Sequence, residues 1–107
     1  MTESMSELLA KLKELDPETW SRVDKVLGLV VYPRSPLGHY IIQGVIQEAI
    51  AADDRFLSFE VRFTSYFDVK YEAEIFWDQP GEILRGFGET AVEAILAAYI
   101  AALEAGR

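Results

Sequence analysis

Three glutamates alternate along two predicted strands and are the clearest candidates for chemistry in this sequence. Glu60, Glu72 and Glu74 would share one face of the strand pair, where carboxylates could act as a catalytic acid–base pair or hold a hard cation. Arg62 and Lys70 lie among them in the sequence. Because opposite charges on neighbouring strands commonly pair, we expect cross-strand ion pairs here in place of a catalytic or metal site.

The other reactive side-chain types are rare or absent. His39 is the single histidine and there is no cysteine, which excludes disulfides, thiolate nucleophiles and metal sites built from cysteine or from several histidines. We expect His39 in solvent, on the polar face of a helix. No serine or threonine lies in a nucleophile motif, and no glycine-rich loop suits a phosphate group. The sequence therefore predicts a protein that is not an enzyme, with no catalytic residues, no metal and no cofactor.

Composition limits the class of protein further. The chain has 107 residues, of which 50% are hydrophobic, and this suffices for one domain with a packed core. Its net charge of -8 argues against nucleic acid as a partner, because phosphate binding requires a basic surface. No signal or transit peptide is recognised, and the longest apolar stretch, residues 94–103, is too short to span a bilayer. We expect a cytoplasmic protein that does not bind membranes.

Three helices are predicted in the first half of the chain. A Ser-x-x-Glu capping box at residues 4–7 begins the first helix. The Asp-Pro pair at residues 16–17 ends it and begins the second, and the Ser-Pro pair at residues 35–36 begins a third that runs to about residue 52. Apolar residues recur at helical spacing in each segment.

Alternation of apolar and polar residues then predicts strands. It extends over residues 56–64 and again over residues 68–77, which indicates two antiparallel strands with one face in water. A turn at residues 78–81 leads into a shorter third strand at residues 82–87. Phe76 breaks the pattern, because it places an aromatic ring on the charged face.

The last helix begins at a second capping box, Thr90 to Glu93, and has seven alanines between residues 91 and 105. A helix that is apolar around its whole circumference does not face water on its far side. Its alanine-rich face lets another backbone approach closely, either the N-terminal helices or a second copy of the chain.

These elements define a single domain over residues 1–107 with an α+β fold. Residues 35–105 form a two-layer α-β-β-β-α core, in which a three-stranded antiparallel meander is flanked by helices, and residues 1–34 form an N-terminal helical extension.

One motif resembles a known family. The segment Leu-Arg-Gly-Phe-Gly-Glu-Thr-Ala-Val-Glu-Ala-Ile at residues 84–95, and above all Gly88 to Ile95, is similar to the last strand and helix start of the phage ABA-sandwich domain family. The resemblance implies a fold of this kind and a phage or prophage setting. It implies no catalytic residues.

Two further families share the outline. Double-stranded-RNA-binding domains have the same α-β-β-β-α order, but they carry lysines at the start of the last helix, where this sequence has Glu89 and Glu93. RNA binding of that type is therefore disfavoured. Residues 76–81, with the Gly-Glu-Thr that follows, are similar to antitoxins of the HicB type, although the spacing between the two motifs is longer here.

Two surfaces are candidates for binding a protein. Phe76 and Leu84 would form a small apolar patch on the charged sheet face, unless residues 29–32 or the first helices cover it. The second and preferred surface is the alanine-rich face of the last helix, represented by Ala94, Ala98, Ala101 and Ala105.

The function predicted from these features is a small acidic, non-catalytic protein–protein interaction module that self-associates or binds a protein partner. The alternative is an acidic inhibitor of a basic nucleic-acid-binding target, of the anti-defence, immunity or HicB-like antitoxin type. The alternative predicts that carboxylates cluster on one surface.

Overall fold

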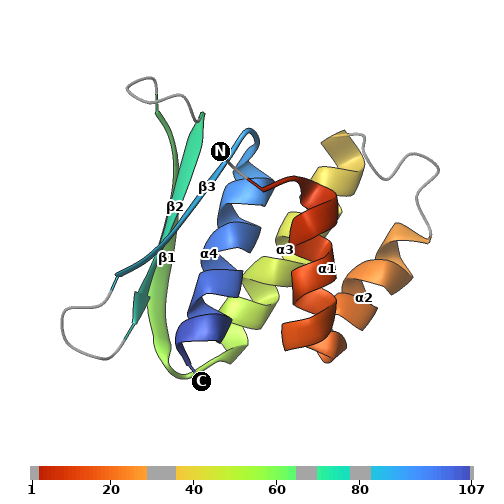
Figure 1. Ribbon diagram of the computed structural model, residues 1–107, viewed down its shortest axis with the longest axis horizontal. Coiled ribbons are helices and arrows are strands. Elements are labelled where there is room, and N and C mark those ends of the chain that lie inside the picture. The colour runs from red at the N-terminus through yellow and green to blue at the C-terminus, as the bar shows by residue number, and fades with distance from the viewer. Residues whose placement is uncertain (1–2, 29–35, 65–69, 78–82, 107) are drawn as a thin grey trace.

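The computed structural model describes residues 3–28, 36–64, 70–77 and 83–106 and has an α+β fold (Figure 1). Within these residues, three helices precede a three-stranded antiparallel sheet and one helix follows it, which confirms the predicted α-β-β-β-α order. None of these helices has both the length and the apolar character that crossing a membrane requires. The elements are α1 (Met5–Leu15), α2 (Pro17–Leu27), α3 (Pro36–Ala52), β1 (Phe56–Phe63), β2 (Tyr71–Trp77), β3 (Ile83–Gly88) and α4 (Ala91–Ala105).

The helix starts follow the capping residues seen in the sequence. Ser4 at α1 and Thr90 at α4 each accept a hydrogen bond from the backbone N–H three residues later. Asp16 ends α1 and caps α2 in the same way. Each cap satisfies a backbone amide that has no partner within its helix. Ser35, the expected cap of α3, lies outside the described residues.

The sheet is a meander in the order β1-β2-β3 with antiparallel neighbours. Its apolar face packs on α4, and Ala73, Ile75 and Trp77 of β2 are buried there. An irregularity in the pairing between Phe56 and Ser58 shifts the alternation at the start of β1. Phe56 is consequently also buried, with its ring edge-to-face against Trp77.

Helix α4 lies at the centre of the molecule, between the sheet and the other helices (Figure 1). It contacts all three strands on one side and packs against α1 and α3 as well. With neighbours on both sides, a helix has to be apolar around most of its circumference. The prediction that this helix does not face water on its far side is confirmed. Its buried residues are Val92, Ala94, Ile95, Leu96, Ala98, Tyr99, Ile100 and Ala102.

Candidate functional site

The protein's own sheet covers part of the alanine-rich face of α4. The prediction that Ala94 and Ala98 contact a partner is therefore wrong. Ala94 and Ala98 are fully buried. Strand β3 crosses them at Gly86, where a Cβ atom would overlap the backbone of both alanines and lie 2.8 Å from the carbonyl carbon of Ala97. The small residues do allow a close backbone approach, but the approaching backbone is β3 and belongs neither to the N-terminal helices nor to a second copy.

The other two predicted alanines lie further along α4. Ala101 is partly exposed, beside β3, and Ala105 is exposed in the last turn of the helix. Both side chains remain accessible to another molecule. Their role in binding stays a prediction.

The apolar residue that faces Phe76 across the strands is Ile83, so the prediction of Leu84 is wrong. The strand register places Ile83 opposite Phe76 and Leu84 opposite Ile75, which is fully buried. Leu84 therefore lies on the core side of β3 and packs partly buried against the core. A difference of one residue in position along a strand moves a side chain to the opposite face of the sheet.

The outer sheet face is the face that α4 leaves uncovered, and no described helix lies over it (Figure 1). Ile83, which is 43% exposed, and the partly buried Phe76 form an apolar region at one end. Phe87, 39% exposed and opposite Glu72, forms another. The first helices, which were possible cover for Phe76, lie beyond α4, and residues 29–32 lie outside the described residues. The outer sheet face consists of Ser58, Glu60, Arg62, Glu72, Glu74, Phe76, Ile83, Arg85 and Phe87.

Glu74, at the centre of the outer sheet face, is held by two arginines. Its side chain is 10% exposed, and its Oε1 lies 3.2 Å from Nη2 of Arg62 and 3.4 Å from Nε of Arg85. Arg62 also pairs with Glu60, and Arg85 with Glu72. The predicted cross-strand pairing is confirmed for Arg62. Arg85 was missed, although the alternation along β3 places it directly opposite Glu74.

Arg62 and Arg85 pair with the three glutamates. No two of these carboxylates are therefore left open to each other as a catalytic acid–base pair would be. Among the described residues, no three histidine, aspartate or glutamate side chains lie close enough together to hold a metal ion. Lys70 precedes β2 and takes no part in the ion pairs that the structure describes. His39 is partly buried beside a hollow lined by residues of α1, α2, α3 and α4, so it is less open to solvent than expected.

Replacing Glu74 by alanine is expected to lower the free energy of unfolding by about 1 kcal/mol, because it leaves two guanidinium groups facing each other without the carboxylate that pairs them. The loss should shrink at high salt, where the repulsion is screened. Urea denaturation at low and high salt measures it. Glu60→Ala is the control, with a side chain 62% exposed and almost no expected change. Equal losses for both variants would contradict a central role for Glu74.

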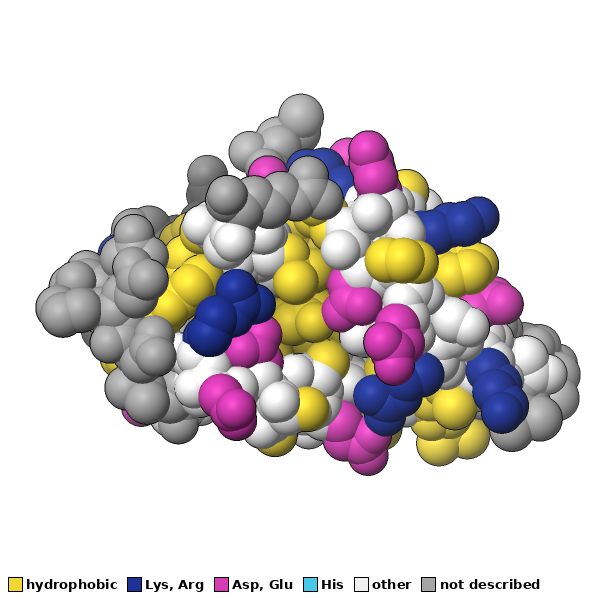
Figure 2. Space-filling view, turned by 90° about the horizontal axis from the view of Figure 1, so that it is seen from below, with side chains coloured by type: hydrophobic (Ala, Val, Ile, Leu, Met, Phe, Trp, Pro, Cys, Tyr) yellow, Lys and Arg dark blue, Asp and Glu magenta, His cyan; other side chains and the backbone are white. Residues whose placement is uncertain are grey.

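A second hollow lies at the lower end of the molecule, where hydrophobic side chains are bordered by acidic and basic ones (Figure 2). Its two central carboxylates have structural partners. Asp16 accepts hydrogen bonds from Tyr99 and Thr19, both at 2.6 Å. Asp53 accepts two from the Arg55 side chain, at 3.0 and 2.7 Å, and these lower the pKa of the aspartate. These groups hold α2, α4 and the start of β1 in place.

The chain matches no protein-family model, no curated protein and no solved structure. The interpretation of the outer sheet face therefore depends on its own residues.

Proposed function

We propose that this protein is a small acidic, non-catalytic interaction module that binds a protein partner through the outer sheet face. The observation that carries the proposal is the apolar surface left open around the ion-paired centre. Ile83 and Phe87 are two of the large hydrophobic residues exposed among the described residues, and both lie on this face. Protein interfaces typically combine apolar contacts with ordered polar groups in this way.

The proposal favours a different protein as the partner over a second copy of the chain. Self-association was expected mainly from the alanine-rich helix, and Ala94 and Ala98 are enclosed by β3. Light scattering at micromolar concentration should therefore give the mass of a monomer. The phage or prophage setting implied by residues 88–95 is part of the proposal.

The alternative function, an acidic inhibitor of a nucleic-acid-binding protein, has less support. It requires carboxylates that cluster on one surface. The described carboxylates do not gather on one surface. Those of the outer sheet face and of the hollow at Asp16 and Asp53 have arginines beside them, and others, such as Glu3 and Glu104, lie elsewhere. Neither the outer sheet face nor this hollow therefore offers a basic target a purely acidic surface.

A quantitative pull-down from host lysate, followed by mass spectrometry, tests the proposed function. The test variant is Phe76→Ser with Phe87→Ser. The control variant is Leu37→Ser with Tyr40→Ser, which removes two apolar side chains exposed by 61% and 71% on α3. A partner retained by the wild type and the control should be reduced at least about tenfold by the test variant, the effect of about 1.4 kcal/mol.

Circular dichroism must show that both variants remain folded. A partner that binds all three proteins equally would contradict the outer sheet face as its site. If the wild type retains no protein above the level of empty beads, the interaction module itself is contradicted.

A further inference from the structure

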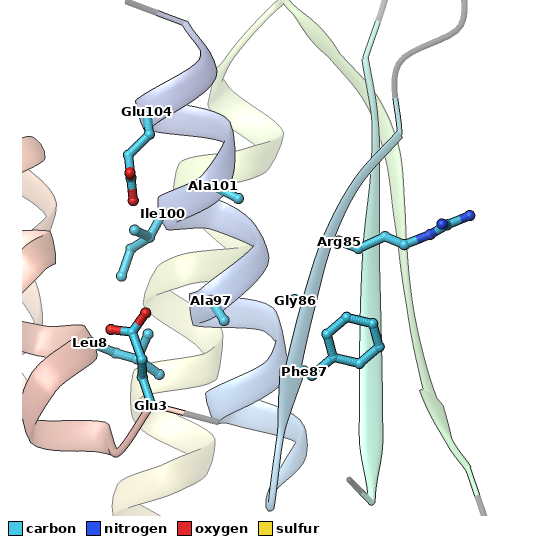
Figure 3. A pocket seen from close by; sticks show the side chains of 9 residues that line it. All are labelled: Glu3, Leu8, Arg85, Gly86, Phe87, Ala97, Ile100, Ala101 and Glu104. Atoms are coloured by element: carbon cyan, nitrogen blue, oxygen red, sulfur yellow. The ribbon is translucent and has the colours of Figure 1, made fainter. Parts of the chain in front are cut away.

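A groove of about 260 Å³ runs along the free edge of β3, on the core side of the sheet (Figure 3). Its floor is made of small and aliphatic side chains, Ala97, Ala101 and Ile100 of α4, and Leu8 of α1 forms the opposite wall. The backbone of β3 around Gly86 forms the remaining wall. We call this feature the edge groove.

The β3 backbone beside the edge groove has hydrogen-bonding groups to offer. Among the described strands, β3 pairs with β2 alone. An edge strand directs every second pair of N–H and C=O groups away from the sheet, where another extended chain can pair with them. Arg85 and Phe87 also line the edge groove. Figure 3 shows their side chains pointing to the side of the sheet away from α4, so they leave its core side open.

The charges around the edge groove favour a basic occupant. The carboxylates of Glu3 and Glu104 lie on the groove beside Leu8 and Ile100 (Figure 3). Lys11 pairs with Glu3 at 2.8 Å and neutralises one of the two charges. Arg85 also lines the groove, but its guanidinium pairs with Glu72 and Glu74. The negative charge of Glu104 therefore remains, on a chain whose net charge is -8. A second copy of this chain would bring the same charges together and be repelled, whereas lysines or arginines of a partner would be attracted.

We propose that an extended basic segment of a partner protein binds in the edge groove as a fourth strand beside β3. Its backbone pairs with the free edge, its small or β-branched side chains face Ala97 and Ala101, and a lysine or arginine reaches Glu104. Pairing along the six residues of β3 would take a segment of about 20 Å. The edge groove lies on the core side of β3 and shares only Arg85 and Phe87 with the outer sheet face, so this proposal does not depend on the proposed function.

The test uses the full chain labelled with ¹⁵N and a blocked peptide of about eight residues that alternates Lys and Thr. The peptide should shift the amide resonances of β3 and slow hydrogen exchange at its free edge. A peptide of the same charge with Pro in place of Thr cannot pair as a strand. It should slow no exchange in β3, which separates strand pairing from simple charge attraction.

Three variants of α4 locate the site. Ala101→Leu fills the edge groove and should weaken binding of the Lys-Thr peptide at least about tenfold. Ala105→Leu adds the same side chain one turn later, at an exposed residue that does not line the edge groove, and should bind as the wild type does. Glu104→Gln should weaken binding several-fold at low salt.

Three results would overturn the proposal: no binding of the Lys-Thr peptide at millimolar concentration, equal β3 protection by the Pro peptide, or unchanged binding by Ala101→Leu. The single variant Phe76→Ser, at a residue of the outer sheet face that does not line the edge groove, should bind the peptide normally. If that variant alone loses the peptide, the basic segment binds the outer sheet face, which contradicts the edge groove and leaves the proposed function standing.

Discussion

Replacing Gly86 by valine is expected to lower the free energy of unfolding by about 3 kcal/mol or more, a large part of the stability of a domain of this size. Gly86 lies where β3 crosses α4, and a Cβ atom there would overlap the backbone of Ala94 and Ala98. Backbone atoms inside a helix cannot move aside as a flexible side chain can. The strand would have to lift away from α4, which would expose core residues of both elements.

Gly44→Ala is the matched control for Gly86→Val. Gly44 lies within α3, and a Cβ atom there would meet nothing within 4 Å. Alanine should therefore raise the free energy of unfolding by about 0.5–1 kcal/mol, because it favours the helix and restricts the unfolded chain. Denaturant titrations of both variants measure the two effects. Unchanged stability in Gly86→Val would show that β3 does not press on α4 as closely as the structure has it.

The features that the sequence predicted best are those set by local physical chemistry. Capping depends on a side chain and a backbone amide three residues apart, so the starts of α1 and α4 could be read directly at Ser4 and Thr90. Strand alternation depends only on which face is wet, and it placed Glu60, Glu72 and Glu74 together. The need to cover an entirely apolar helix followed from composition alone.

The candidate contact residues were harder to predict, because they depend on which elements meet. Nothing in the composition of α4 indicated that β3, and not another helix or another chain, would cover Ala94 and Ala98. The register of β3 against β2 depends on a connection between the strands, and it decides whether Ile83 or Leu84 is exposed. Gly86 was the available signal, because a glycine within a strand often marks a close approach of another backbone.

Replacing Asp16 is also expected to destabilise the protein strongly. Its carboxylate caps α2 and accepts hydrogen bonds from Thr19 and from Tyr99 of α4, at 2.6 Å in each case. Asp16→Ala should lower the free energy of unfolding by about 3 kcal/mol, since a lost cap costs about 1 kcal/mol and a lost charged hydrogen bond about 1.5–3 kcal/mol. The nearby Asp54, which is exposed, is the control, and Asp54→Ala should change stability by less than about 0.5 kcal/mol.

The hydrogen bond to Tyr99 can be separated from the cap by a double-mutant cycle. Burial and the Asp16 carboxylate raise the pKa of the Tyr99 hydroxyl, which therefore remains a proton donor. Tyr99→Phe should cost about 1–2 kcal/mol in the wild type and much less in the Asp16→Ala background, where the acceptor is already absent. Additive losses from the two substitutions would contradict a direct interaction between α4 and the junction of α1 and α2.

The same contact predicts how stability depends on pH. Burial opposes ionisation of Asp16, but the hydrogen bonds from Thr19 and Tyr99 outweigh it and lower the pKa of this carboxyl below the usual 3.8. A carboxyl whose pKa is lower in the folded state stabilises the protein fully above its unfolded pKa, and this contribution is lost as the pH falls through the folded value. Asp16→Asn should therefore reduce the fall of the urea midpoint between about pH 6 and about pH 2.5. Part of the fall should remain, because the pKa of Asp53 is lowered in the folded protein as well. An unchanged slope in Asp16→Asn would contradict a lowered pKa of Asp16 in the folded protein.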